Sequence, residues 1–259
     1  MVHQDPSRRD ILVGAAGLAA TVSLAGCGTS TASLDPKLPS TPLATGGWTH
    51  VDTVEEAANT EIDILGRPQQ VSITAQAEVY ENNGPVTELT QRYNVDVDAS
   101  TIPAMGFIAA KARPNPPVTR LLGLSDGLMT HAVGLAEDRA IRALRDRGLE
   151  NVRLIEEGSL AVAAGPTADH RLYRAAYPYD AFHGRYRGRQ VTVAAGTLDV
   201  EVQLGVWPYR GLLTSGAGLY PAEAGDLTLT ADGFSTTVSL GFEPEAYRKQ
   251  LRELISLIS

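Results

Sequence analysis

The chain has 259 residues, with 22 basic and 30 acidic side chains and a formal net charge of -8 at pH 7. This balance disfavours nucleic acid as a partner, because proteins that bind nucleic acid present basic surfaces to the phosphates. Cys27 is the single cysteine. It excludes an intramolecular disulfide and any metal or redox site that needs several cysteines.

The first 27 residues have the pattern of a targeting segment. An arginine pair, Arg8 and Arg9, stands just before an apolar run of mostly small residues at positions 11–22. That run is shorter than the about 20 apolar residues that cross a bilayer, but it fits the apolar region of a signal peptide. The sequence Leu24-Ala25-Gly26-Cys27 comes directly after it.

This segment resembles a twin-arginine signal peptide that ends in a prokaryotic lipobox. The resemblance implies that Arg8 and Arg9 direct export, and that Cys27 carries a lipid and becomes the first residue of the mature protein. It also implies a location on the outer face of the cytoplasmic membrane. Ile11 stands where the twin-arginine pattern usually has phenylalanine, so the general secretory route is the alternative.

The use of basic residues adds a second resemblance. Only three of the 22 basic residues are lysines, Lys37, Lys111 and Lys249, and Ala, Gly and Val are abundant. In this respect the chain is similar to uncharacterised, twin-arginine-exported cell-surface lipoproteins of halophilic archaea, with actinobacterial envelope lipoproteins as the second choice. Neither resemblance implies an activity.

Residues 28–47 are rich in Ser, Thr, Pro and Ala and show no hydrophobic period. This composition predicts a flexible tether between the lipid and a folded domain. The domain is expected over residues 48–259, as one unit or as two packed halves, with Trp48 as the residue that anchors its start.

Alternation of apolar and polar residues predicts half-buried antiparallel strands in the domain. The clearest examples are residues 71–79, 93–97 and 197–206. The loop chemistry of residues 81–85 predicts a hairpin between the first two. In the third, Asp199, Glu201 and Gln203 are expected to face water. Residues 214–218, which contain Ser and two glycines, are typical of a flexible loop.

Two segments have helical spacing. The first carries a stripe that ends near Gly148, formed by Val133, Ala136, Ala140 and Leu144. The second begins at Pro244, and its apolar face comprises Tyr247, Leu251, Leu254, Ile255 and Ile258. The predicted fold class is therefore α+β: antiparallel sheets with two main helices packed on them, after a disordered tether.

Reactive side chains are densest in residues 169–189. The candidates for binding an anion or another ligand there are Arg171, Arg174, Arg185, Arg187 and Tyr177. Arginine offers forked donors that match carboxylates and phosphates, and tyrosine offers a flat ring. The alternative is that these residues are ordinary cross-strand neighbours on the outer face of a hairpin.

The same segment contains Asp169-His170 and Asp180-x-x-His183. Two imidazoles and two carboxylates could in principle bind a metal, but the spacing matches no established metal motif, so we predict neither a metal nor a cofactor. The sequence has no phosphate-binding loop or dinucleotide fingerprint. We therefore predict no catalytic residue.

The tripeptide Trp207-Pro208-Tyr209 could form an aromatic platform for a ligand, or it could end a strand with Trp207 in the core. Three functions remain open. The favoured one is a non-enzymatic, membrane-anchored binding or scaffold domain, because no catalytic group of residues stands out. The alternatives are an envelope hydrolase that uses carboxylates or His170 and His183, and an accessory subunit held over a partner in a membrane complex.

Overall fold

The computed structural model describes residues 33–64, 67–97, 105–115, 127–146, 148–165 and 167–259. Arg8, Arg9 and Cys27 lie outside these residues. Strands hold about 60% of the described chain and helices about 20%. The predicted α+β class is therefore wrong, and the protein is mainly β. The prediction gave two amphipathic stripes the same weight as a much larger number of strands.

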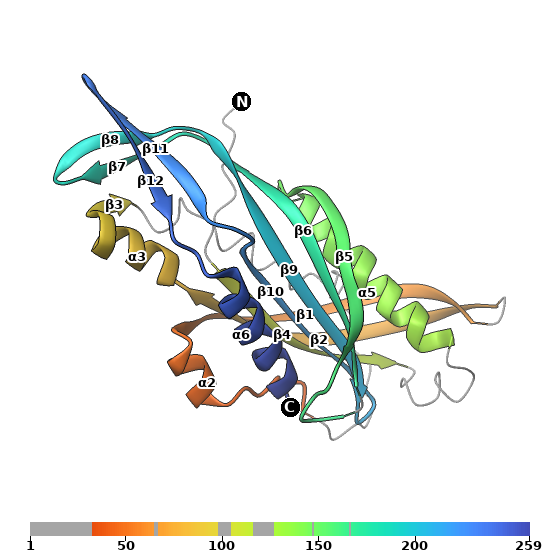
Figure 1. The fold of residues 1–259 in the computed structure, drawn as a ribbon. Coiled ribbons are helices and arrows are strands. Elements are labelled where there is room, and N and C mark those ends of the chain that lie inside the picture. Colours follow the sequence, from red (N-terminus) through yellow and green to blue (C-terminus); the bar gives the residue numbers. More distant parts are fainter. Residues whose placement is uncertain (1–32, 65–66, 98–104, 116–126, 147, 166) are drawn as a thin grey trace.

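The larger of the two sheets has seven strands in the order β1-β2-β4-β10-β9-β6-β5, and all neighbours are antiparallel (Figure 1). Its strands are β1 (Trp48–Ile64), β2 (Arg67–Asn82), β4 (Met105–Asn115), β5 (Glu150–Leu160), β6 (Ala168–Tyr179), β9 (Gly196–Tyr209) and β10 (Leu212–Pro221). The residues predicted to be a loop at 214–218 thus lie inside the central strand β10.

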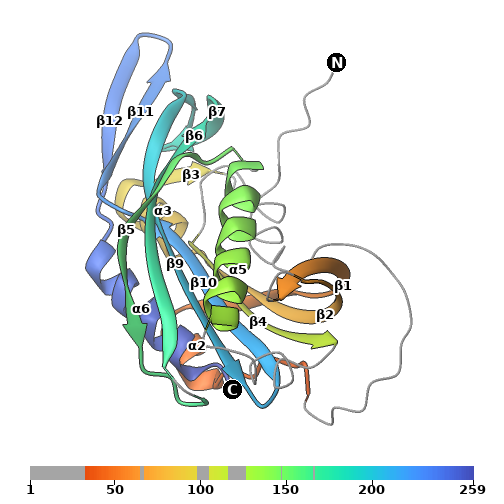
Figure 2. The same cartoon turned by 90° about the vertical axis from the view of Figure 1, so that its right-hand side faces the viewer.

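The described residues contain four helices: α2 (Ser40–Thr45), α3 (Gly84–Tyr93), α5 (Gly127–Asp146) and α6 (Pro244–Leu257). Helix α6 contacts β9 and β10, whereas α5 contacts β5 and β9 from the opposite side of the large sheet (Figure 2). Proline at the first position of α6 costs no hydrogen bond, because the first amides of a helix have no partner within it. None of the helices in the described ranges is long and apolar enough to cross a membrane.

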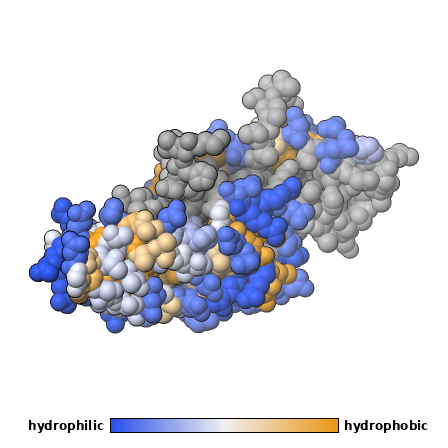
Figure 3. Space-filling view, turned by 90° about the horizontal axis from the view of Figure 1, so that it is seen from above, coloured by the Kyte–Doolittle hydropathy of each residue, from blue (hydrophilic) through white to orange (hydrophobic). Residues whose placement is uncertain are grey.

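The smaller sheet has five antiparallel strands in the order β12-β11-β8-β7-β3 and lies at one end of the large sheet (Figure 1). Its strands are β3 (Val95–Val97), β7 (Phe182–Tyr186), β8 (Arg189–Val193), β11 (Gly225–Ala231) and β12 (Phe234–Leu240). One face is buried through Leu229 and Val238, and the other exposes Thr228 and Thr237. From above, the left-hand part of the molecule mixes hydrophilic residues with residues of intermediate hydropathy (Figure 3).

The predicted hairpin at residues 81–85 is wrong. Strand β2 runs into α3, and β3 pairs with β7 in the small sheet, so the two alternating segments belong to different sheets. The amide of Gly84 donates to Asn82 Oδ1 at 2.8 Å, and the chain then turns into a helix. Loop residues such as Asn and Gly favour a turn but do not decide whether a strand or a helix comes after it.

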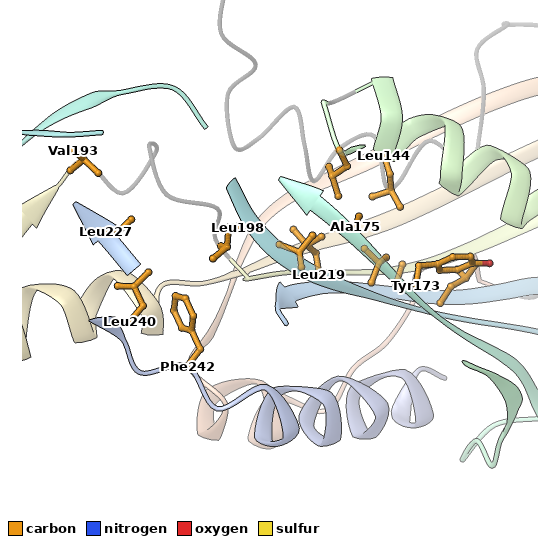
Figure 4. Packing of buried hydrophobic residues seen from close by; sticks show 14 of the residues in the cluster. Leu144, Tyr173, Ala175, Val193, Leu198, Leu219, Leu227, Leu240 and Phe242 are labelled. Carbon is orange, nitrogen blue, oxygen red and sulfur yellow. The ribbon is translucent and has the colours of Figure 1, made fainter. Parts of the chain in front are cut away.

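Buried side chains cover both faces of the large sheet. On the α5 side, Leu144 and Leu219 belong to a cluster that continues to Leu227 and Leu240 of the small sheet (Figure 4). On the α6 side, Leu251 and Ile255 pack with Trp207. From Val200 to Trp207, strand β9 is therefore buried on both faces. The expectation that its polar residues face water is wrong for Glu201 and Gln203, which are 3% and 0% exposed.

The second half of the predicted tether lies on the domain. Backbone amides and carbonyls of Lys37 and Ser259 form two hydrogen bonds of 3.0 Å, and Lys111 Nζ donates to the carbonyl of Asp35 at 2.8 Å. Leu38 and Leu43 pack against the α6-side cluster. The packed chain thus begins near residue 35, because these two leucines find apolar partners that composition alone does not reveal.

Candidate functional site

The five residues predicted as a binding cluster do not form one site. Arg171 and Arg174 lie on β6 in the large sheet, on opposite faces, whereas Arg185 and Arg187 belong to the small sheet and its turn. Tyr177 is partly buried against the α5-side core. The separation arises because the chain leaves the large sheet after β6 and continues into β7 of the small sheet.

Arg171 and Arg174 are held in ion pairs. Arg171 Nη1 lies 3.1 Å from Glu137 Oε2, and Arg174 Nη2 lies 2.9 Å from Asp199 and 3.0 Å from Glu223. Glu137 also accepts a hydrogen bond of 2.6 Å from the hydroxyl of Tyr173, and burial together with this bond raises the pKa of that hydroxyl. These two arginines thus connect β6 to its neighbours, as the cross-strand alternative expected.

Arg185 and Arg187 are exposed at the far end of the small sheet. The guanidinium of Arg187 lies 5.1 Å from the ring centre of Tyr186, and that ring stacks on Phe234 at 5.8 Å. Arg187 and Gly188 have φ values of +50° and +79°, which form a tight turn between β7 and β8. Arg189 begins β8, so the turn and the strand ends beside it display three arginines, Arg185, Arg187 and Arg189.

The two predicted histidines lie in different environments. His170 is 4% exposed on β6, and its Nε2 lies 3.2 Å from Gln203 Oε1. Burial lowers the pKa of His170. His183 is exposed on β7 beside Thr192. The two histidines thus lie in different sheets. The described residues contain no group of three His, Cys, Asp or Glu side chains suited to a metal.

The aromatic platform is also absent at Trp207. Its ring is fully buried, and its indole Nε1 donates to the carbonyl of Ala164 at 2.8 Å. Tyr209 is half-buried, with the guanidinium of Arg210 at 5.0 Å from its ring centre. Trp207 therefore belongs to the core, as the alternative interpretation of this tripeptide expected.

A buried polar network between α6 and the large sheet was missed at the sequence level. Arg248 Nη2 donates to both carboxylate oxygens of Glu201 at 2.7 Å, and the Tyr220 hydroxyl donates to Glu201 at 2.5 Å. Gln203 Nε2 donates to the carbonyl of Arg248 at 2.9 Å, while its Oε1 faces His170. The hydrogen bond to Glu201 raises the pKa of Arg248, and burial raises that of Tyr220.

These groups satisfy one another. The buried carboxylate has a guanidinium and a hydroxyl as partners, so its charge is compensated where water is excluded. The arrangement fixes α6 to β9 and β10. No local motif signals it, because Glu201 and Arg248 meet only through the topology.

A shallow groove of about 620 Å³ lies between the end of α2 and helix α3. It is lined by glycines and by residues with polar side chains, namely Thr45, Gly46, Gly47, Asn82, Asn83, Gly84, Thr87, Gln91 and Arg92. Asn82 is buried and donates to the Gly46 carbonyl at 2.6 Å, which connects the two sides of the groove. Its amides and hydroxyls could take a small polar molecule by hydrogen bonding.

Comparison with known proteins places the chain in a family. No curated protein matches it, and no solved structure matches it. Residues 35–259 match a family model described as "Domain of unknown function (DUF6517)", and the match begins where the packed chain begins. The chain therefore belongs to the DUF6517 family.

Proposed function

We propose that this protein is a lipid-anchored domain on the outer face of the cytoplasmic membrane, which binds an anionic partner at the end of its small sheet. The anchor is Cys27 within Leu24-Ala25-Gly26-Cys27. Residues 28–34 separate Cys27 from the packed chain, and at about 3.5 Å per residue they reach at most about 25 Å. The end of the domain that holds Asp35 thus stays near the bilayer.

One observation supports this orientation most directly. Residues 35–37 lie beside Ser259, at the end of α6, and the small sheet lies at the other end of the molecule in both views (Figures 1 and 2). A domain anchored through its first residues would hold the small sheet away from the membrane. Partners in solution or in the envelope would then meet that end first.

The small sheet offers basic groups to such a partner. Arg185, Arg187 and Arg189 are exposed, and none of them forms an ion pair within the described part of the chain. They form a local positive region in a protein whose net charge is -8. Such a region attracts anions against the general field of the molecule.

The anion-binding part is tested with fluorescent poly-L-glutamate as the probe. A double variant, Arg185→Gln with Arg187→Asn, removes two charges, and asparagine before Gly188 retains the tight turn. We expect binding to weaken about tenfold or more at low salt, with a smaller difference at high salt because salt screens exposed charges. Fluorescence polarisation measures the affinity at low and at high salt.

A matched control removes two exposed arginines from α5, Arg142→Gln with Arg145→Gln. Binding should change little. Equal weakening by the two double variants would show a general charge effect and contradict a site at the small sheet.

The anchor is tested separately in cells. Cys27→Ser should give a protein that is unprocessed or released, and detergent partitioning follows the lipid. A Cys27→Ser protein that is cleaved and partitions like the wild type would overturn the lipoprotein assignment.

A further inference from the structure

The end of the domain opposite the small sheet has its own charge pattern. Lys37 and Arg210 are exposed there. Both lie close enough to Lys111 to interact electrostatically with its ammonium group, as does Asp35. The backbone carbonyl of Asp35 also accepts a hydrogen bond of 2.8 Å from Lys111 Nζ. Two of the three lysines in the chain thus meet an arginine at the point where the chain joins the domain.

Small apolar and aromatic residues accompany these cations. The connection between β5 and β6 exposes Ala161 and Ala163, and the amide of Ala163 donates to the Ser256 carbonyl at the end of α6. Gly165 in the same connection lies against Tyr209, which precedes Arg210 in the turn between β9 and β10. The β5–β6 connection, the β9–β10 turn and the end of α6 therefore form one surface around Lys37 and Arg210.

We propose that this surface contacts anionic lipid headgroups, a proposal that rests on the lipid anchor proposed above. The seven residues from Gly28 to Leu34 hold this end of the domain within about 25 Å of the bilayer. Exposed lysine and arginine are attracted to anionic headgroups, and small apolar loops and tyrosine suit the interface. The contact would fix the orientation that displays the small sheet.

The test uses the unlipidated polypeptide from Gly28 to Ser259, which contains every residue that the structure describes. It is sedimented with vesicles of phosphatidylcholine alone and with vesicles that also contain phosphatidylglycerol. We expect binding to the anionic vesicles only. Lys37→Gln with Arg210→Asn should weaken it about 25-fold, because each basic side chain at an anionic surface contributes about a fivefold change. Asparagine retains the turn at Arg210, whose φ is +50°.

Two further variants locate the contact. Arg142→Gln with Arg145→Gln on α5 should leave vesicle binding unchanged. If Arg185→Gln with Arg187→Asn weakens it instead, the small sheet faces the lipid and the proposal is wrong. The proposal is also wrong if the wild-type polypeptide binds both kinds of vesicle equally, or if it binds neither.

These outcomes are independent of the anchor. Because the polypeptide lacks Cys27, a failure of lipid attachment in cells leaves the vesicle result unchanged. Unaltered thermal unfolding of each variant shows that a change in binding comes from the surface and not from misfolding.

Discussion

Between Val200 and Trp207 the two faces of β9 are both buried, yet they are built from different chemistry. The face toward α5 consists of Leu198, Val200, Val202, Leu204 and Val206. The face toward α6 carries Glu201 and Gln203, and then Gly205 and Trp207. A strand can thus alternate apolar and polar residues and still have no side in water.

The comparison shows what each face needs from its helix. The α5 side requires only apolar side chains of suitable volume, since dispersion and burial have no direction. The α6 side requires particular partners, because a buried carboxylate without a countercharge is costly. Substitutions on the α6 side should therefore separate helix packing from charge compensation.

Arg248→Ala should have the largest effect. It leaves the carboxylate of Glu201, which is 3% exposed, without its guanidinium partner. Removing one member of a buried pair costs about 3–5 kcal/mol, and the 23% exposure of the Arg248 side chain favours the lower end. Urea unfolding measures the loss.

The same helix provides the control. Arg252 pairs with Glu156 at 2.6 Å, and both side chains are more than a third exposed. Arg252→Ala should cost about 0–1 kcal/mol, as surface pairs do. Similar losses for the two variants would show that the buried network contributes no more than a surface pair.

Sequence reasoning found the apolar face of β9 but not the second buried face. The alternation in residues 197–206 correctly identifies a strand and its hydrophobic side. The polarity of Glu201 and Gln203 predicted that their side chains face water. Arg248, the partner of Glu201, lies 47 positions away, and no local pattern connects the two. Burial of a polar residue is decided by which element covers it.

The candidate binding cluster was mispredicted for the same reason. Residues 169–189 are close in sequence, but the chain passes from one sheet to the other within them. Arg171 and Arg174 meet Glu137, Asp199 and Glu223 from other elements, and only the turn arginines remain exposed. Local composition identified the reactive residues but not their partners.

Gly216→Val should have the next largest effect. Gly216 and Gly205 lie opposite each other on β10 and β9, directly under α6. A Cβ atom on Gly216 would lie 2.7 Å from Ile258 Cδ1 and 3.0 Å from Ile255 Cγ1, so these isoleucine side chains or the helix must shift. Overpacking of this kind costs about 1–3 kcal/mol, measured by urea unfolding.

Gly158→Val is the matched control for Gly216→Val. Gly158 also lies in a strand, β5, but a Cβ atom there meets nothing within 4 Å. The free energy of unfolding should stay the same or rise, because valine favours strands. A loss at Gly158 equal to that at Gly216 would contradict close helix packing as the cause. Contact with α6 would then not explain why residues 214–218, predicted as a loop, contain glycines inside a strand.

The smallest effect is the change that His170→Gln makes in the pH dependence of stability, and it is confined to acidic pH. Burial lowers the pKa of His170 from its ordinary 6.5, so the folded state keeps the ring neutral where the unfolded chain takes up a proton. The folded state therefore loses stability as pH falls below 6.5, until the folded pKa is reached. Between about pH 7 and about pH 5, the free energy of unfolding should fall more steeply for the wild type than for His170→Gln. His183→Gln, at an exposed position, should retain the wild-type slope. Equal slopes for wild type and His170→Gln would mean that the polar face under α6 admits a proton at no cost, and that its burial is less complete than that of the apolar face.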